Sequence, residues 1–153
     1  STNVDLNIAY QNFSAARAVS VNKNDSNSIK TWFNTNYNTN IAIDTLNMTE
    51  LKKAYIIALQ TELNSQSNAG LKVDGNLNSN TSKYFSSLNF QNGEQNRLTY
   101  VIQSALFYKG YYSGMPTGIW DAKAGSAVQS FQNSENISGN GTLNAETLRQ
   151  LFR

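Results

Sequence analysis

The sequence predicts an all-α protein that consists of two tandem small three-helix-type repeats behind an N-terminal, partly helical segment. Two observations carry this prediction. Apolar residues recur at three- and four-residue steps over most of the chain beyond residue 48, which is typical of helices with one buried face. A shift by 43 positions also superposes residues 59–88 on residues 102–131. An unbroken offset of this kind indicates an internal duplication.

The N-terminal segment, residues 1–48, does not match the repeat. Residues 4–10 alternate between apolar and polar side chains, whereas residues 29–33 have helical spacing. The segment is too apolar for a pure linker, although it could derive from one, so we expect one or two helices that dock on the first repeat. Its apolar side chains include Trp32, Phe33, Tyr37, Ile41 and Ile43.

The first repeat, residues 49–96, is expected to form helices over 49–64 and 80–88. The second repeat, residues 97–153, is expected to form three helices, over 96–109, 122–132 and 145–152. Gly70 and Gly110 stand just beyond two of these helices. Glycine in that position is expected to cap the C-terminus of a helix.

One turn pattern occurs three times: Gly, any residue, Leu or Trp, then Asn or Asp, beginning at Gly75, Gly118 and Gly141. Glycine adopts the positive φ of a tight turn without strain. The Asn or Asp that follows three residues later can accept hydrogen bonds from the first amides of a helix. Each copy is therefore predicted to be a turn that begins a helix.

The composition excludes several kinds of chemistry. The 153 residues contain no His and no Cys, so the chain has no thiolate nucleophile, no imidazole base and no typical zinc site. We expect no cofactor, no metal and no catalytic residue. Asn, Ser, Thr and Gln make up 61 residues, and the net charge is only +2. Scattered basic residues with so small an excess argue against nucleic acid as a partner.

No apolar run of 18 residues exists, so we expect neither a transmembrane helix nor a membrane partner. The chain begins at Ser1 without a basic and apolar leader, which suggests that any signal peptide has been removed. The absence of cysteine fits a reducing compartment as well as export from a bacterium that makes little use of disulfides.

The second repeat resembles the peptidoglycan-binding domain type 1 family of three-helix cell-wall modules. Thr117 and Asn140 stand where that family has Asp, and Asp121-Ala122 replaces Gly-Pro. Residues 51–88 resemble a degenerate copy that keeps Leu59-Gln60-x-x-Leu63. The motifs that carry the resemblance are Ile102-Gln103-x-x-Leu106, Gly110-Tyr111-Tyr112, Thr117-Gly118-x-Trp120, Ala127-Val128-x-x-Phe131-Gln132 and Asn140-Gly141 with Thr147.

Modules of that family are usually attached to phage endolysins and bacterial autolysins. The resemblance therefore implies a non-catalytic protein that binds bacterial peptidoglycan and targets a covalently linked lytic domain to it. It also implies a location outside the cell or in the cell wall, or a phage-encoded protein that acts on the wall. Val4-Asp5-Leu6-Asn7 resembles the closing strand of some lysozyme-type muramidase domains.

A site for wall glycan or peptide needs aromatic faces together with amides or hydroxyls. Tyr111, Tyr112 and Trp120 could supply the rings, and Gln132 and Asn140 the amides. Each has a structural alternative. The rings could pack the small core, and Asn140 could simply shape a turn. Gln132, like Gln103, could hold a loop in place, because a buried side-chain amide must be hydrogen-bonded.

Two other functions remain open on the sequence. A small wall-degrading glycoside hydrolase would need a pair of carboxylates across a cleft. Against this, Asp121 fits a helix cap, Asp74 a turn, and Glu146 the first turn of a helix, where an acid complements the helix dipole. The third possibility is a protein–protein assembly module that uses the same fold.

Overall fold

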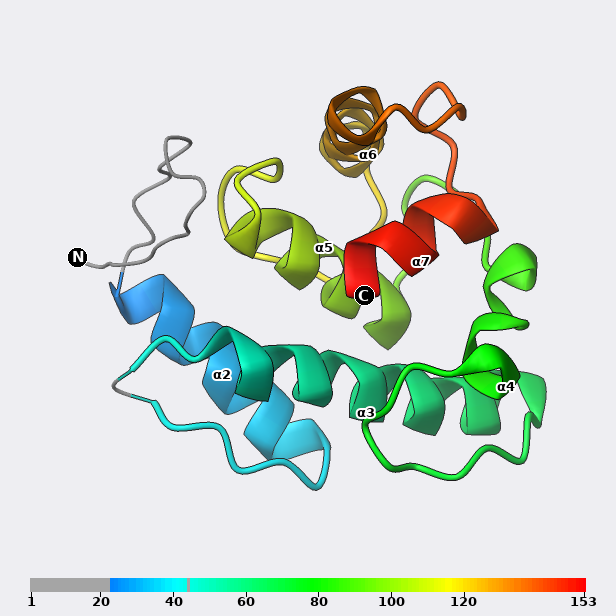
Figure 1. Ribbon diagram of the computed structural model, residues 1–153. Helices are drawn as coiled ribbons and strands as arrows, with labels where there is room; N and C mark the ends of the chain where they lie inside the picture. The colour runs from blue at the N-terminus through cyan, green and yellow to red at the C-terminus, as the bar shows by residue number, and fades with distance from the viewer. Residues whose placement is uncertain (1–22, 44) are drawn as a thin grey trace.

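The computed structural model describes residues 23–43 and 45–153, and within them the chain is helical (Figure 1). Among these residues there is no strand, only an isolated bridge between Gln95 and Ile119. The predicted all-α class is thus confirmed for the described part. Its elements are α2 (Lys23–Asn36), α3 (Met48–Ser67), α4 (Ser79–Ser82), the 3₁₀ turn η1 (Phe85–Ser87), α5 (Arg97–Tyr108), α6 (Ala122–Glu135) and α7 (Ala145–Phe152).

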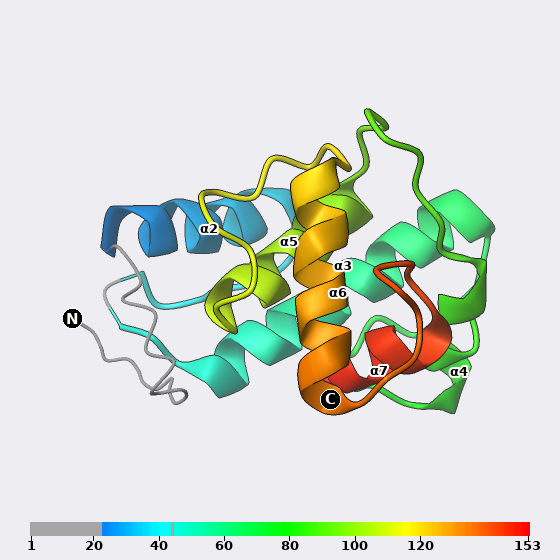
Figure 2. The ribbon, with the colours of Figure 1, turned by 90° about the horizontal axis from the view of Figure 1, so that it is seen from above.

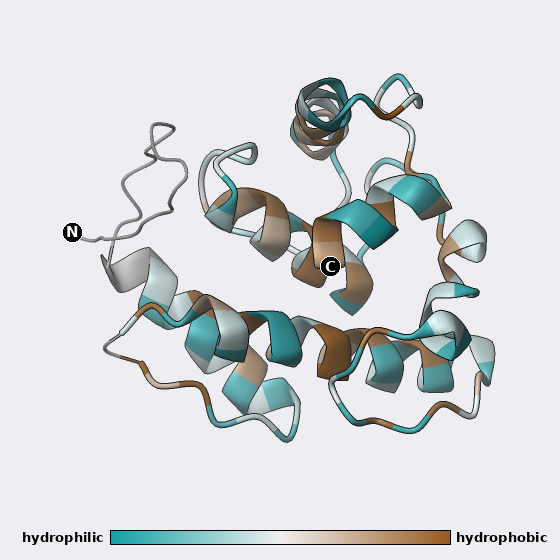
Figure 3. Ribbon diagram, in the orientation of Figure 1, coloured by the Kyte–Doolittle hydropathy of each residue, from teal (hydrophilic) through white to brown (hydrophobic). Residues whose placement is uncertain are grey.

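Helix α5 lies at the centre of the molecule. All its residues except Arg97 are buried. Helices α2 and α3 lie below it in Figure 1, and α6 lies across it on the other side, as the view from above shows (Figure 2). Figure 3 shows the hydropathy that goes with this arrangement: α5 is largely apolar, whereas α3 and α7 carry polar stretches. A helix that is apolar on most sides needs cover on most sides.

Asparagine and aspartate define where the helices begin. In each case the side-chain oxygen accepts a hydrogen bond from a backbone N–H in the first turn, which satisfies one of the amides that have no partner within the helix. This use of Asn explains how a chain so rich in that residue still forms sharply bounded helices. The capping residues are Asn47, Asn78, Asn96, Asp121 and Asn144 for α3, α4, α5, α6 and α7.

Two local predictions are wrong. The helix expected over 80–88 is replaced by α4 and η1, because only Thr81 and Phe85 in these two elements are buried and the Ser- and Asn-rich sequence favours turns over a longer helix. Helix α3 ends at Ser67, and its cap is Asn68 in the left-handed conformation (φ 53°) instead of Gly70. Asparagine tolerates that conformation better than most residues.

The second half follows the sequence prediction closely. Helix α5 ends at Tyr108, and Gly110 has the positive φ of 90° expected of a glycine after a helix. Helix α6 begins at Ala122, as predicted, and runs three residues beyond the predicted end, to Glu135. Helix α7 matches its predicted range.

The N-terminal segment is part of the core as far as it is described. Helix α2 contains the predicted patch: Phe33 is fully buried and its ring lies 5.6 Å from that of Tyr55 in α3. Trp32 stacks on Tyr100 of α5 with the ring centroids 3.8 Å apart. One apolar core therefore continues across the boundaries at residues 48 and 96. The alternating stretch at residues 4–10, with Val4-Asp5-Leu6-Asn7, lies outside the described residues.

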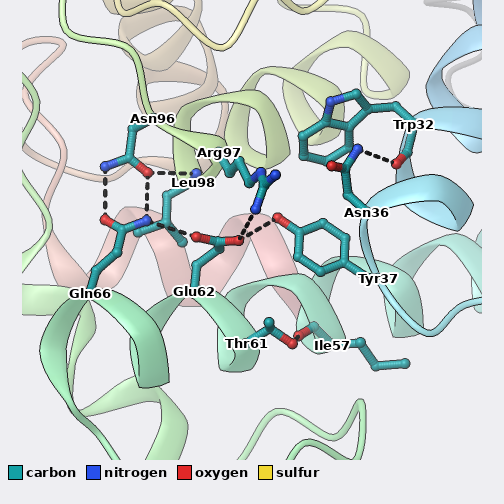
Figure 4. A network of polar contacts seen from close by, with 10 residues as sticks. All are labelled: Trp32, Asn36, Tyr37, Ile57, Thr61, Glu62, Gln66, Asn96, Arg97 and Leu98. Atoms are coloured by element: carbon teal, nitrogen blue, oxygen red, sulfur yellow. Dashed lines mark hydrogen bonds and ion pairs between the residues drawn. The ribbon is translucent and has the colours of Figure 1, made fainter.

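A buried carboxylate ties three parts of the chain together (Figure 4). Tyr37, just after α2, donates a hydrogen bond of 2.9 Å to Glu62 of α3, and Arg97 of α5 lies 3.8 Å from the same carboxylate oxygen. Burial and the neighbouring negative charge of Glu62 raise the pKa of Tyr37, so its hydroxyl stays protonated and remains a donor. Gln66 and Asn96 form a reciprocal amide pair beside it, at 2.9 Å in each direction.

If the N-terminal segment contributes to stability in this way, Phe33→Ala should lower the free energy of unfolding by about 3–5 kcal/mol, the cost of removing a fully buried aromatic ring. Urea denaturation followed by circular dichroism would measure it. The control is Val73→Ala, which truncates an exposed side chain and should cost less than about 0.5 kcal/mol. Equal midpoints for the two variants would contradict the packing of α2 on α3.

Candidate functional site

The turn before α6 is held by a buried glutamine. Oε1 of Gln103 accepts hydrogen bonds from the backbone N–H groups of Thr117 and Gly118, both at 2.9 Å. Nε2 of Gln103 donates to the carbonyl of Ile119 at 3.0 Å. Gly118 has φ 79°, a conformation that glycine adopts without strain. The side-chain amide thus supplies the hydrogen-bond partners that the backbone groups of the turn would otherwise lack.

The same arrangement holds the other two glycine turns. Oε1 of Gln60 accepts from the N–H of Gly75 at 3.0 Å, and Oε1 of Gln132 accepts from the N–H of Gly141 at 2.8 Å. Each Nε2 donates to the carbonyl of the residue after its glycine, at 3.1 and 2.8 Å. The amides of Gln103 and Gln132 therefore act as loop holders, and the amide of Gln132 is directed into the fold.

Tyr112 also lies inside the fold, with 2% of its surface exposed. Nζ of Lys123 lies 4.5 Å from the centre of its ring, and the same ammonium donates to the carbonyl of Ser113 at 2.6 Å. Burial, and next the charge of Asp121, raise the pKa of Tyr112. The ring and its neighbours close the space between the loop after α5 and the first turn of α6.

Trp120 is 8% exposed and stacks on Phe90 with the ring centroids 5.6 Å apart. Its backbone N–H donates to the carbonyl of Glu94 at 3.0 Å, and its carbonyl accepts from the N–H of Gly93 at 2.8 Å. Trp120 therefore fixes the 90–94 loop against the turn before α6. Neither Tyr112 nor Trp120 presents an open ring face to solvent.

Tyr111 and Asn140 are the two predicted residues that reach the surface. Tyr111 is half-buried; its ring lies at 73° to that of Phe131 with the centroids 5.6 Å apart, and its hydroxyl donates to Ser134 at 2.9 Å. Asn140 is exposed in the turn before α7, with φ 51°. Ile119, on the neighbouring glycine turn, is 41% exposed. The surface of residues 97–153 therefore offers part of an aromatic ring, hydroxyls and amides.

The acids named in the sequence analysis have structural roles. Asp121 caps α6 by accepting from the N–H of Ala124 at 2.7 Å, and Asp74 accepts from the N–H of Asn76 at 2.9 Å within its turn. Glu146 pairs with Arg149 at 3.1 Å. Among the described residues no three His, Cys, Asp or Glu side chains gather as metal ligands. No helix in that part of the chain is long and apolar enough to cross a membrane.

Two features of the structure were not predicted from the sequence. Glu62, the buried carboxylate of Figure 4, could have been found from its place beside Leu63 on the apolar face of α3. The other is a polar hollow in residues 69–83, between the loop that begins at Ala69 and helix α4. No motif points to it, because its lining comes from separate stretches of the chain, residues 69–74 and 78–83.

Residues 96–151 match the family model described as a putative peptidoglycan binding domain. The matched segment begins at the cap of α5 and ends within α7, and it contains two of the three glutamine-held turns. No curated protein and no solved structure matches the chain. The resemblance read from the motifs is thus confirmed for the second unit.

If Gln103 holds its turn as described, Gln103→Leu should lower the free energy of unfolding by about 2–6 kcal/mol, because it leaves two backbone N–H groups without partners at about 1–3 kcal/mol each. Hydrogen exchange at Gly118 should also become faster. Gln91→Leu, on an exposed glutamine, is the control and should change stability by less than about 0.5 kcal/mol. A loss no larger in Gln103→Leu than in this control would refute the role.

The first turn should be sensitive to acid. The N–H of Asn76, and next the amide of Gln60, hold the pKa of Asp74 below its ordinary value. A carboxyl whose pKa is lowered by folding contributes stability above its unfolded pKa, about 3.9, and loses it as the pH falls through the folded pKa. Asp74→Asn should therefore reduce the drop in melting temperature between pH 6 and pH 2.5. Glu135→Gln, on an exposed carboxyl of α6, should keep the full drop, and equal curves would argue against the Asp74 effect.

Proposed function

We propose that this protein binds bacterial peptidoglycan without making or breaking covalent bonds, and that it targets a lytic enzyme to the cell wall. The observation that carries the proposal is the family match over residues 96–151. The match coincides with the unit of α5, α6 and α7, in which buried glutamines fix the turns. Cell-wall association follows from the same match, and we propose a location outside the cell or in the wall.

We propose that the contact surface lies around Tyr111 and Asn140. Tyr111 can place the exposed part of its ring against a sugar or peptide and can accept a hydrogen bond at its hydroxyl oxygen, and Asn140 can offer an amide at the exposed end of the next turn. In this proposal Tyr112, Trp120 and Gln132 do not contact the ligand, because each is buried and already packed or hydrogen-bonded. They hold the loops that carry the contact residues.

The binding is expected to be weak at each site and to tolerate salt. The surface is rich in uncharged amides and hydroxyls, and the net charge of the chain is +2, so electrostatic capture over long distances is small. Linking such a module to a second module or to an enzyme raises the effective concentration at the wall without any new contact. This is the physical advantage of attaching it to a lytic domain.

We further propose that residues 49–96 are a degenerate copy of the unit in residues 97–153. The support is the offset of 43 positions, which relates Gln60 to Gln103 and Gly75 to Gly118 together with their hydrogen bonds. The proposed copy has lost most of its second long helix, which is represented only by α4 and η1. Such a loss would leave the second unit as the main wall-binding part.

The proposed function predicts that the protein sediments with purified sacculi and releases neither reducing ends nor amines from them. A hydrolase using a carboxylate pair would release one or the other. An assembly module would stay in the supernatant and co-purify with a protein partner. Retention without product supports the proposal, and release of product or absence of retention with sacculi from several bacterial species would reject it.

Two substitutions test the contact surface. Tyr111→Ala and Asn140→Gly should each weaken retention about two- to tenfold, the range expected for loss of a single aromatic contact or a single hydrogen bond. Asn140→Gly keeps the left-handed backbone, because glycine adopts positive φ freely. Asn68→Gly is the matched control, since Asn68 is also exposed and left-handed (φ 53°) but lies at the end of α3. Unchanged retention in both test variants, with circular dichroism like that of the control, would move the site elsewhere.

A further inference from the structure

The first unit contains a polar hollow of about 320 Å³ beside the Gly75 turn. One wall is the loop from Ala69 to Asp74, and the other is formed by residues of and around α4, including Asn78, Asn80 and Lys83. Below it, Gln60 holds the turn by hydrogen bonds to the N–H groups of Asp74 and Gly75, both 3.0 Å. The Asp74 end of the hollow is therefore held in place by the fold.

In the second unit a tyrosine side chain occupies the corresponding place. Ala69 is the residue 43 positions before Tyr112. The N–H of Ala69 lies 3.4 Å from the carbonyl of Leu63, and the N–H of Tyr112 lies 3.3 Å from that of Leu106, again 43 positions later. The two residues thus make the same backbone contact to the ends of their long helices.

The neighbours of the Tyr112 ring support this correspondence. Lys123 lies 4.5 Å from the ring centre, and Thr117 and Asp121 are near enough to the hydroxyl to influence the pKa of Tyr112. At the same offset these three residues correspond to Asn80, Asp74 and Asn78, all of which line the hollow. The hollow is therefore the space that a tyrosine side chain fills in the second unit and that alanine leaves open in the first.

The charges around the hollow indicate what it can hold. Lys72 and Lys83 line it, and Lys83 is positioned with its ammonium 5.5 Å from the centre of the Tyr84 ring. Asp74 lines it too, with both hydrogen bonds from the protein on Oδ1, which leaves Oδ2 for a ligand. None of the lining side chains is aromatic. The hollow thus combines two cations with one anion and offers no ring face for a sugar.

We propose that this hollow binds a short peptide bearing both carboxylate and ammonium groups, namely the stem peptide of peptidoglycan; the identity of the peptide rests on the proposed function. Lys72 and Lys83 bind its carboxylates, Oδ2 of Asp74 accepts from its ammonium, and Asn78 and Asn80 offer side-chain amides to its backbone. The first unit then recognises the charged peptide, while the second presents uncharged groups to the wall.

The test uses the full chain and a synthetic stem tetrapeptide with a free terminal carboxylate. Two-dimensional NMR should show saturable shifts at Lys72, Asn80 and Lys83 in the wild type. Ala69→Tyr, which supplies the ring that the second unit already has, should weaken binding at least tenfold. The double variant Lys72→Gln with Lys83→Gln keeps the space open and should weaken it about tenfold, whereas Lys52→Gln, on an exposed lysine outside the hollow, should not change it.

Each outcome decides the matter. Shifts confined to the hollow and lost in both test variants support the proposal. No shift with the tetrapeptide, shifts elsewhere, or shifts at the hollow with an uncharged N-acetylglucosamine oligomer instead would overturn it. If Ala69→Tyr does not fold, the double lysine variant decides alone. Sedimentation with sacculi is measured separately, so retention without peptide binding rejects only the hollow, and peptide binding without retention rejects only the wall-targeting function.

Discussion

The turns of this protein depend on a buried primary amide that pairs with backbone groups. A glutamine side chain has one acceptor and two donors, so it can satisfy both an N–H and a carbonyl of a tight turn. Gln60, Gln103 and Gln132 each do so, and each is at most 1% exposed. Because a helix follows each turn directly, the amide also fixes the position of that helix. Asn140, one of the two candidate contacts, directly precedes a glycine held in this way.

The low apolar content of the chain is offset by where its apolar residues lie. Helix α5 is buried along nearly its whole length, and rings from α2, α3 and α7 gather around it, among them Trp32, Tyr55 and Phe152. Aromatic side chains remove a large area from water for each residue ordered. One shared core therefore stabilises the N-terminal segment and both units together, which explains how units of about 50 residues can be stable within this chain.

Most of the helices and their caps could be predicted because their signals are local. Glycine followed by Asn or Asp sets both the turn and the helix start, and Asp121 and Asn144 behave as predicted. The sequence alone could not exclude a helix over 80–88, since its absence depends on how few of these residues are buried against the rest of the fold. The orientations of Tyr112 and Trp120 could not be predicted either, because a ring beside a turn can point inward or outward. The inward orientation depends on packing against Lys123 and Phe90, respectively.

The glutamine-held turns also affect the rates of spontaneous deamidation and isomerisation. Asn-Gly and Asp-Gly pairs are prone to deamidate or isomerise, because the glycine nitrogen attacks the preceding side-chain carbonyl to form a succinimide. In Asp74-Gly75 and Asn140-Gly141 that nitrogen is held by the amides of Gln60 and Gln132, and in Asn92-Gly93 it is held by the carbonyl of Trp120, at 3.0, 2.8 and 2.8 Å. Cyclisation would first have to break these bonds. The native fold should therefore slow the formation of isoaspartate at these pairs, and loss of the fold should release it.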